Sequence, residues 1–523
     1  MINNIKLIDL FAGPGGLGEG FSSIKKYERF NSSVSVEMDQ VAVETLRFRK
    51  FYRIANQEKG KLLQDYYSLL ENPKSFNSYL ENHKNKNLIK ELNQSVWNHE
   101  LGSISPEKTY WEISSRLNSL KKKQSECIII GGPPCQAYSL SGRSRRSKML
   151  KQGAYIPKKD ERHFLYQQYL GLLPMFKPAI FIMENVPGIL SSKMNGGFIF
   201  EQILDDLRNI EGKIKYELFP LTKLEEIDMF DSYKGKDFQI NCEEYGVPQA
   251  RKRVIIMGIR SDLLSSNAPK MFLEKNDQVS VENIIGSMPK LRSGVSKIKG
   301  QSVKDSEELW KREVTNWYGY KKGIEDKEIK EALFDLYLPK VESLSLNRGA
   351  EYLEYSNYKT SCDALPKDLR QWIIDRKLNG FSNSSTRAHM DTDLKRYMYN
   401  SVYTQTHGKA PLLSNVPDLI KPAHANKNEK IHQDRFRTLN PNRPSKTITS
   451  HISKDGHAFI HYDPTQCRSL TVREAARIQT FPDNYFFCGN RTQQYHQVGN
   501  AVPPYLAKQI AEVVSNYLES VGI

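Results

Sequence analysis

The stretch "LIDLFAGPGGLGEGF", residues 7–21, joins a short apolar run to a glycine-rich loop. Gly13, Gly15 and Gly18 satisfy the pattern G-x-G-x-x-G, and Glu37 ends the next apolar run along the chain. This order is typical of an α/β fold that binds an adenosine-containing cofactor. Glycines let the backbone approach any such ligand closely, and a carboxylate can bind any ribose. NAD, FAD and S-adenosylmethionine are therefore all candidates at this point, and a purely structural turn is the alternative.

Length, composition and charge narrow the class of protein. The chain has 523 residues, of which 39% are hydrophobic, enough for two or three domains with a sizeable core. It shows neither a leader pattern nor an apolar run of about 18 residues, so we expect a cytoplasmic protein. Its six cysteines are scattered without a CxxC pair, which favours reduced thiols and argues against a metal site. A net charge of +16 indicates nucleic acid as a partner, with a solvated lysine-rich surface as the alternative.

The first 260 residues alternate apolar runs with helical periodicity, which predicts a mostly parallel α/β sheet. The helical stretch "FIFEQILDDL" places Phe200, Ile203, Leu204 and Leu207 on one face, as a helix that covers a sheet requires. Five stretches are predicted strands, the last of them half-exposed: 34–37, 127–130, 179–183, 253–259 and 214–219.

The remaining chain predicts two further regions. Residues 51–126 are rich in Lys, Asn and Glu, and we interpret them as an insertion of polar surface helices. The strand–helix rhythm is lost beyond residue 260 and returns near residue 431. The last helix, opened by Pro503 and Pro504, has an apolar face that could pack back on the first domain. The predicted division is a first domain over 1–260, a second over 261–430, and a return segment over 431–523.

The most informative local signal is "CIIIGGPPCQAYSLSGR", residues 127–143. A buried strand ends in two glycines and two prolines, so the following side chains project from a constrained loop at the carboxyl edge of the sheet, where ligands bind in open α/β folds. Cys135 is presented there and is a candidate nucleophile, provided that its surroundings favour the thiolate. Cys127 lies inside the strand and is expected to be inert core.

Two further signals follow predicted strands. In "AIFIMENVPGIL", residues 179–190, Glu184 stands at a strand's carboxyl end, where partial burial could keep it protonated as a proton donor. In "YGVPQARKRVIIMG", residues 245–258, Arg251 and Arg253 alternate, so both point to one face and suit a phosphate and a base carbonyl. An ordinary cap and a solvated edge charge are the respective alternatives.

Taken in order, these motifs resemble those of the cytosine-C5 DNA methyltransferases. The resemblance covers most of residues 1–260 and 431–520. It is carried by "DLFAGPGGLGEGF", "GGPPCQ", "ENV", "QARKR" and "QVGNAVPP", and supported by "RPSKTIT" and "SLTVREAARIQTFPDNY". It implies a Rossmann-like methyltransferase sheet with a second, smaller target-recognition domain, and S-adenosylmethionine rather than a nicotinamide as the cofactor.

The resemblance also implies roles for individual residues in the cofactor pocket. Phe11 would lie against the adenine, with Met38 as a further apolar partner, and Glu37 would hold the ribose hydroxyls. "NHELGS", with Glu100 and Leu101, is a weak candidate for a further adenine contact. The methionine pocket would be shaped and closed by Gly13, Gly15, Leu17, Asn500 and Val502.

In the chemistry that the resemblance implies, a thiolate from Cys135 adds to C6 of cytosine and makes C5 nucleophilic. Glu184 would protonate or hydrogen-bond N3, Arg253 would hold O2, and Arg251 fits a phosphate or supporting role better. No metal is needed. Because C6 is inaccessible inside a stacked duplex, the cytosine must be flipped out.

The predicted partner is double-stranded DNA, gripped and read by 261–430, and the chain is expected to act as a monomer. Residues 385–397 either contribute to this grip or merely begin a charged helix. A modification enzyme of a restriction-modification system, with a cognate endonuclease, is the usual setting for the family. The alternatives are an RNA cytosine-C5 methyltransferase and a catalytically silent nucleic-acid-binding relative.

Overall fold

The structure is a computed structural model. It describes residues 5–24, 29–30, 32–72, 76–82, 86–119, 126–133, 162–194, 197–210, 214–223, 233–265, 269–422 and 433–523. The chain forms two compact units: unit 1 comprises 1–66, 74–277 and 501–523, and unit 2 comprises 67–73 and 278–500. Among the described residues, no helix has both the length and the apolar character needed to span a membrane.

Unit 1 is built on an eight-stranded sheet with the order β3-β2-β1-β4-β5-β11-β8, in which β9 also pairs with β11. Strands β1 to β5 pair in parallel, and β11 runs antiparallel to β5, β8 and β9. Its strands are β1 (Lys6–Leu10), β2 (Ser32–Glu37), β3 (Val96–Asn98), β4 (Cys127–Gly131), β5 (Ile180–Asn185), β8 (Tyr216–Phe219), β9 (Gln239–Asn241) and β11 (Lys252–Arg260). The mostly parallel α/β sheet predicted from the sequence is thereby confirmed, and the antiparallel pairing of β11 adds to it.

Both faces of this sheet are covered by helices, which explains why its central strands read as continuous apolar runs. The helices of unit 1 are α1 (Gly16–Ser22), α2 (Gln40–Glu58), α4 (Phe76–Asn82), α5 (Lys86–Ser95), α6 (Pro106–Ser119), α8 (Arg162–Phe176), α9 (Ile199–Arg208) and α18 (Pro504–Ser520), and α3 (Gly60–Glu71) crosses into unit 2. Helix α9 buries the four predicted residues Phe200, Ile203, Leu204 and Leu207. One short pair of strands, β6 (Lys193–Met194) with β7 (Gly197–Phe198), and the short strand β10 (Gln249–Ala250), which precedes β11, complete the unit.

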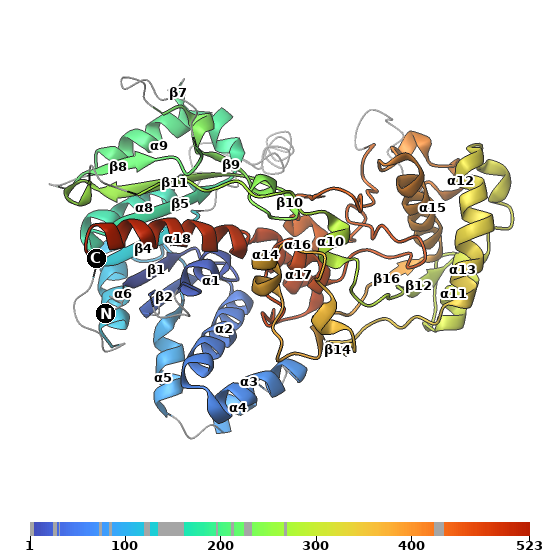
Figure 1. Cartoon of the computed structure of the whole chain (residues 1–523), viewed down its shortest axis with the longest axis horizontal. Coiled ribbons are helices and arrows are strands. Elements are labelled where there is room, and N and C mark those ends of the chain that lie inside the picture. Colours follow the sequence, from blue (N-terminus) through green and yellow to red (C-terminus); the bar gives the residue numbers. More distant parts are fainter. Residues whose placement is uncertain are drawn as a thin grey trace. The chain divides into compact units, whose positions relative to one another are not determined.

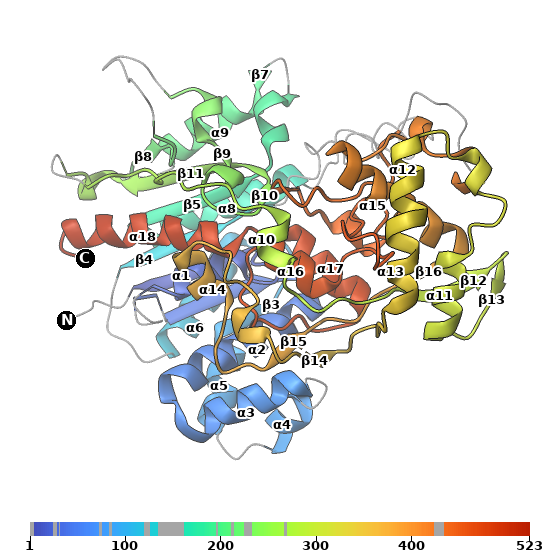
Figure 2. The ribbon, with the colours of Figure 1, turned by 45° about the vertical axis from the view of Figure 1, so that its right-hand side comes forward.

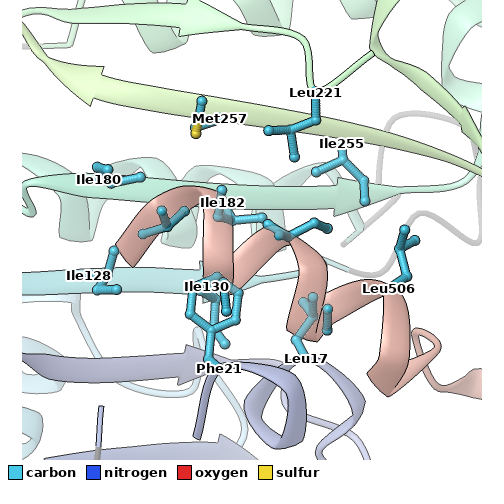
Figure 3. Close-up of a cluster of buried hydrophobic side chains, with 14 of the residues drawn as sticks. Leu17, Phe21, Ile128, Ile130, Ile180, Ile182, Leu221, Ile255, Met257 and Leu506 are labelled. Carbon is cyan, nitrogen blue, oxygen red and sulfur yellow. The ribbon is translucent and has the colours of Figure 1, made fainter. Parts of the chain in front are cut away.

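Helix α18 lies beside α1 and along one face of the sheet, as Figure 1 and the turned view of Figure 2 agree. Glycines make this closeness possible, because a side chain at Gly20 would collide with the backbone of Ala507 and Lys508. The core between these elements contains, among others, Leu17, Phe21, Ile128, Ile130, Ile180, Ile182, Ile255 and Leu506 (Figure 3). The predicted return of the last helix to the first domain is therefore observed.

One expectation about the fold was wrong. Residues 51–126 are not only a polar surface insertion, because β3 within them pairs with β2 and forms the edge of the central sheet. Leu101, Ile113 and Leu117 from the same region are buried in the core of unit 1. A three-residue strand between polar helices carries too little apolar periodicity to stand out in the sequence.

Unit 2 has its own core, in which Trp310 is fully buried. Its helices are α10 (Val281–Ile285), α11 (Glu307–Thr315), α12 (Lys327–Glu331), α13 (Leu338–Ser343), α14 (Lys367–Ile373), α15 (Asp391–His407), α16 (Val472–Ile478) and α17 (Arg491–Asn500). Its strands are β12 (Gly294–Ile298), β13 (Gln301–Ser302), β14 (Tyr352–Glu354), β15 (Gly380–Ser382), β16 (Ala388–Met390) and β17 (Ser445–Lys446).

The compact units divide at other residues than the predicted domains. Residues from 433 to 500 cluster with unit 2, where Phe436 and Ile460 pack on Tyr397, and Cys467 joins the core around Trp310. The functional division at 260 and 430 stays a prediction.

Candidate active site

The glycine loop follows β1 and adopts backbone conformations that favour glycine. Gly13 and Gly15 have φ values of 55° and 88°, and Gly15 directly precedes α1. Phe11 also has a positive φ of 56°, an uncommon conformation for a residue with a side chain. A side chain at Gly13 would meet nothing within 4 Å, so the loop backbone borders open space there. The loop thus exposes backbone at the carboxyl end of β1, as a cofactor-binding loop must.

The loop is fastened to the end of β2 by Glu37. The backbone N–H of Gly13 donates to Glu37 Oε2 at 2.8 Å, and that of Asp39 donates to Oε1 at 2.8 Å. Burial raises the pKa of the Glu37 carboxyl, while these N–H groups oppose that shift. Met38 follows with 64% of its surface exposed. The two residues predicted to hold the ribose and the adenine therefore stand at the same strand end.

Asn98, the first residue of "NHELGS", holds this strand end from β3, a role that the sequence analysis did not assign to it. Its amide donates to the carbonyls of Glu37 and Met38, each at 3.1 Å. The candidate "NHELGS" continues from Asn98, with Glu100 exposed and Leu101 buried. Its place beside Met38 follows from the parallel pairing of β2 with β3. In the sequence, the role of Asn98 was indicated only by its position at the start of "NHELGS".

Asp9, a second missed residue, is buried beneath the loop. A side chain at Gly18 would come within 2.6 Å of Asp9 Oδ2, an atom with no hydrogen-bond partner among the described residues. Burial raises the pKa of Asp9 to about 7, and nearby Glu37 raises it further, against the opposing effects of Arg53 and the Gly18 N–H. Asp9 therefore holds a proton in part at neutral pH.

A buried ion-pair network anchors α1. Glu19 accepts hydrogen bonds from Arg49 Nε at 2.9 Å, Arg49 Nη2 at 2.5 Å and Arg53 Nη2 at 2.8 Å. Although burial opposes ionisation, the two arginines hold the pKa of Glu19 down to about 2. The charges of Arg49 and Arg53 are thereby engaged within the protein and fix α2 to α1.

The return segment supplies one of its two predicted cofactor residues to unit 1. Val502 is buried in the same cluster as Leu17, and a side chain at Gly16 would collide with the Val502 carbonyl. Asn500 belongs to unit 2 as the last residue of α17, where its amide nitrogen lies 3.3 Å from His496 Nδ1. Leu17 and Val502 thus meet beside the glycine loop.

The ends of β4 and β5 bring the candidate catalytic loop beside Glu184. A side chain at Gly131 would come within 2.5 Å of the Leu10 carbonyl, and one at Gly132 within 2.7 Å of Glu184 Oε2. Cys135 lies outside the described residues, and only two residues separate it from Gly132 in the sequence. The chain therefore enters the predicted nucleophile loop between the cofactor loop and the carboxylate of Glu184.

Glu184 and Arg253 meet across the antiparallel pair of β5 and β11. Arg253 Nε lies 2.5 Å from Glu184 Oε1, and both side chains are mostly buried. Arg251 is fully buried and donates from Nη2 to the Ala501 carbonyl at 2.8 Å. Burial and the neighbouring Arg253 lower the pKa of Arg251 to about 9. Arg253 and Glu184 thus form a pair, whereas Arg251 ties β11 to the return segment.

The other cysteines are poor candidates for a nucleophile. Burial raises the pKa of the Cys127 and Cys242 thiols to about 12 and that of Cys362 to about 11. Cys467 is also buried, and Cys488 is half-buried in unit 2. At neutral pH these buried thiols are inert, as expected for Cys127.

This arrangement can bind an adenosine-type cofactor and act on a base beside it. Backbone N–H groups, the carboxylate of Glu37 and the exposed side chain of Met38 meet at the ends of β1 and β2. A carboxylate and a guanidinium meet two strands away, suited to a heterocyclic nitrogen and a carbonyl oxygen. The described residues hold no cluster of His, Cys, Asp and Glu suited to a metal.

A family model described as C-5 cytosine-specific DNA methylase matches residues 67–516. The type II methyltransferase M.Bpa9945I of Bacillus paralicheniformis is 32% identical over 529 residues, covering 98% of this chain and 99% of the relative. The type II methyltransferase M.DdeI of Desulfomicrobium norvegicum is 26% identical over 538 residues, covering 99% and 90%.

A solved structure shares the fold. A crystal structure of a protein described as a prophage-encoded DNA modification methyltransferase of E. coli is 20% identical, with a TM-score of 0.50, and covers 99% of this chain and all of that one. At this level of identity the likeness concerns the fold alone.

Proposed function

Since the chain belongs to the family of C-5 cytosine-specific DNA methylases, we propose a specific reaction and site for it. As a member of this family it is a DNA (cytosine-5-)-methyltransferase. We propose that its methyl donor is S-adenosylmethionine, that the target cytosine is flipped out of a specific double-stranded sequence, and that Cys135 forms a transient covalent bond to C6 of this base.

The cofactor assignment is supported by the charges around the glycine loop. When bound, S-adenosylmethionine supplies a methyl group activated by a positively charged sulfonium. Even with their raised pKa values, the carboxyls of Asp9 and Glu37 add no positive charge to the loop, so the loop suits a cationic sulfonium better than the doubly charged pyrophosphate of NAD. Glu37 would hold the ribose and Met38 and Phe11 the adenine, with Glu100 and Leu101 near it. The methionine end would lie against Gly13, Gly15, Leu17 and Val502, and Asn500 would complete the pocket.

The catalytic assignment is supported by the pairing of Glu184 with Arg253. The thiolate of Cys135 would add to C6, and the electron pair of the C5–C6 double bond would shift toward C5 and the N3–O2 system. Glu184 would give a proton or hydrogen bond to N3, and Arg253 would hold O2. After C5 has taken the methyl group, its proton would leave to a water molecule and the thiolate of Cys135 would be expelled.

Arg251 fits a supporting role in this proposal. Its burial and its hydrogen bond to Ala501 would keep β11, and with it Arg253, in place. A direct contact of Arg251 with a phosphate would require a rearrangement of this bond.

We propose that unit 2 reads the DNA sequence and that the enzyme modifies DNA within a restriction-modification system. The DNA-reading role of unit 2 is supported by the net charge of +16 and by the size of this unit. The role in a restriction-modification system is supported by the similarity to type II methyltransferases over nearly the whole chain. A cognate endonuclease, a monomeric state and a cytoplasmic location belong to the same proposal.

The observation that carries the catalytic proposal is the contact of Gly132 with the carboxylate of Glu184, where the chain enters the "PPCQ" loop. It is tested with duplex DNA in which 5-fluorocytosine replaces the target cytosine. Fluorine cannot leave as a proton does, so the covalent adduct should persist in the presence of S-adenosylmethionine and be visible on a denaturing gel.

Cys135→Ser is the decisive variant, since it should bind S-adenosylmethionine normally yet form no adduct and no 5-methylcytosine. Cys488→Ser is the matched control and should behave as the wild type, because Cys488 lies in unit 2. An adduct that forms equally well in Cys135→Ser would assign the chemistry to another thiol. Methylation of RNA but not of duplex DNA would overturn the substrate assignment.

A further inference from the structure

Segment 385–397, which the sequence analysis noted as a charged stretch, contains both buried and partly exposed basic side chains. Lys395 is buried and donates to the Glu313 carbonyl at 3.0 Å, and Arg396 is buried and donates to the Ile420 carbonyl at 2.8 Å. These two side chains hold unit 2 together and are not available to a partner. Arg387, by contrast, belongs to a group of arginines near the surface.

Three arginines from separate parts of unit 2 converge at Thr386. The Thr386 carbonyl accepts hydrogen bonds from Arg348 Nη2 at 3.2 Å and from Arg491 Nη1 at 2.6 Å. Arg387, the next residue, places its guanidinium 4.6 Å from the centre of the Tyr495 ring, four residues along α17 from Arg491. We call Arg348, Arg387 and Arg491 the arginine cluster.

The arginine cluster has an excess of positive charge. Among the described residues, Arg387 and Arg491 form no ion pair with a carboxylate, and their hydrogen bonds go to backbone carbonyls. Asp305 reaches Arg348 only at 3.5 Å, because both of its oxygens are held by Arg292 at 2.9 and 3.0 Å. Burial and the positive charges of Arg387 and Arg348 lower the pKa of Arg491.

The positive charge of the arginine cluster also affects the pKa of a neighbouring histidine, His389. Burial lowers the pKa of His389 well below its usual value, and His457 and all three arginines of the cluster act in the same direction. His389 is therefore neutral and adds no charge of its own. Like charges held together with only one shared counter-ion, Asp305, cost free energy, which a bound anion would relieve.

The cluster is accessible and shaped for an anion with several oxygens. The Arg348 side chain is 36% exposed, and the adjoining Asn347, Asn490, Thr492 and Gln493 are exposed. A side chain at Gly294 would lie 2.6 Å from Arg348 Cζ, so Gly294 leaves the space that this guanidinium occupies. Each guanidinium has five N–H donors, and the hydrogen bonds of Arg348 and Arg491 to other described residues use only some of them.

We infer that Arg348 and Arg491 bind one phosphate of the DNA backbone, with Arg387 adding positive charge behind them. This inference rests on the proposed function, since DNA is the polyanion that the enzyme must hold. A phosphate accepts hydrogen bonds from several directions, whereas a guanine edge takes one guanidinium in its own plane. Two guanidinium groups that approach one point from different elements therefore suit a phosphate better than a base.

The test measures the affinity of the full chain for duplex DNA by fluorescence anisotropy between 50 and 300 mM salt. Loss of one phosphate contact should reduce the slope of log Kd against log salt by about 1 and weaken binding several-fold. We expect this loss of slope and affinity for Arg491→Gln and for Arg348→Gln. It should be equal on DNA with and without the sequence that the enzyme recognises. Arg491→Lys keeps the charge and should retain most of the slope.

Arg370→Gln is the matched control and should leave the slope unchanged, because Arg370 is a half-exposed arginine of unit 2 that is paired with Asp363 at 3.2 Å. Thermal unfolding checks that the variants fold as the wild type does. A neutral methylphosphonate, moved along the DNA backbone, should reduce the affinity of the wild type at one position where it leaves Arg491→Gln unaffected.

Two results would overturn the inference: unchanged slopes in both glutamine variants, or a loss confined to the methylated sequence, which would indicate that a base is read. A wild type without salt-dependent affinity for DNA would instead refute the proposed function, so the two failures are distinguishable.

Discussion

Gly132 has no side chain, and the space that one would take is occupied by a carboxylate oxygen of Glu184. The chain continues from this point into the loop of Cys135, so the glycine sets how closely that loop passes the carboxylate. A methyl group at this position would displace the end of a side chain rather than backbone, so the effect should concern chemistry more than folding.

We therefore predict that Gly132→Ala lowers the turnover number by about tenfold to a hundredfold, because a shift of about 1 Å in a catalytic group has effects of this size. The free energy of unfolding should change by less than about 1 kcal/mol. Steady-state methylation assays and urea titration measure the two quantities. Gly197→Ala is the control, since a side chain there would meet nothing within 4 Å; equal turnover in both variants would contradict the prediction.

Asp9 leads to a prediction about pH. Its pKa is about 7 in the folded protein, against a usual value of 3.8, chiefly because of burial. Between these pH values the folded state holds a proton that the unfolded state has lost, so stability falls as the pH rises. Asp9→Asn removes this dependence. Between pH 5 and 7, the free energy of unfolding of Asp9→Asn minus that of the wild type should therefore increase by about 1 kcal/mol per pH unit.

Urea titrations of both proteins at pH 5, 6 and 7 measure this difference. A gap that stays constant over the range would show that Asp9 does not carry the buried proton.

At the scale of residues, the sequence predicted what local motifs encode. Glu184, Arg253 and Glu37 were each proposed from their position at the end of a predicted strand, and their roles stay predictions. Asn98 and Asp9 were missed, because their roles depend on the neighbouring strand and on the approach of Gly18, which no spacing in the sequence expresses. The place of Cys135 in the site stays a prediction.

At the scale of elements, the pairing of α1 with α18 depends on small residues. Gly20 of α1 faces the backbone of α18 at Ala507 and Lys508 without room for a methyl group. Backbone cannot move aside as a side chain can, so a substitution here must separate the helices. The same contact places Val502 beside the glycine loop.

We predict that Gly20→Ala lowers the free energy of unfolding by about 1 to 3 kcal/mol, the usual cost of an extra methyl group in a packed core. The affinity for S-adenosylmethionine should fall with it, because Val502 would be displaced. Urea titration and equilibrium dialysis measure the two effects, again with Gly197→Ala as the control. A fully stable Gly20→Ala protein would show that the helices can adjust.

Long apolar runs made the main elements predictable. Strands β4, β5 and β11 were expected within one or two residues, because strands buried on both faces leave a continuous apolar signal. Strand β3 was not predicted, because Val96 is its only buried residue and because its pairing with β2 depends on tertiary structure.

At the scale of the whole molecule, unit 1 is assembled from segments at both ends of the chain. Residues 501–523 return to it after unit 2 and contribute Leu506, Ile510, Val514 and Leu518 to its core. The sequence predicted this return from the last motif and the apolar face of the final helix. It did not predict that residues 433–500 cluster with unit 2, because packing between segments leaves no periodic signal.

We predict that a chain ending at Asn500 is insoluble or binds no S-adenosylmethionine, since it leaves the face of β4 and β5 uncovered. Leu506→Ala is a milder test and should cost about 2 to 5 kcal/mol, as expected for a buried leucine. Solubility, cofactor binding and urea titration are the measurements. A soluble chain ending at Asn500 with normal cofactor affinity would refute the structural role of α18.

The discontinuity of unit 1 also has a consequence for biosynthesis. The ribosome makes β1 to β11 first, then residues 278–500, which form nearly all of unit 2, and only afterwards α18, which covers one face of the sheet. A nascent chain thus carries an uncovered apolar face during the translation of more than two hundred residues, which makes it a natural client for chaperones. Because α18 covers this face, we expect that chains cut short before α18 by a stalled ribosome do not modify DNA.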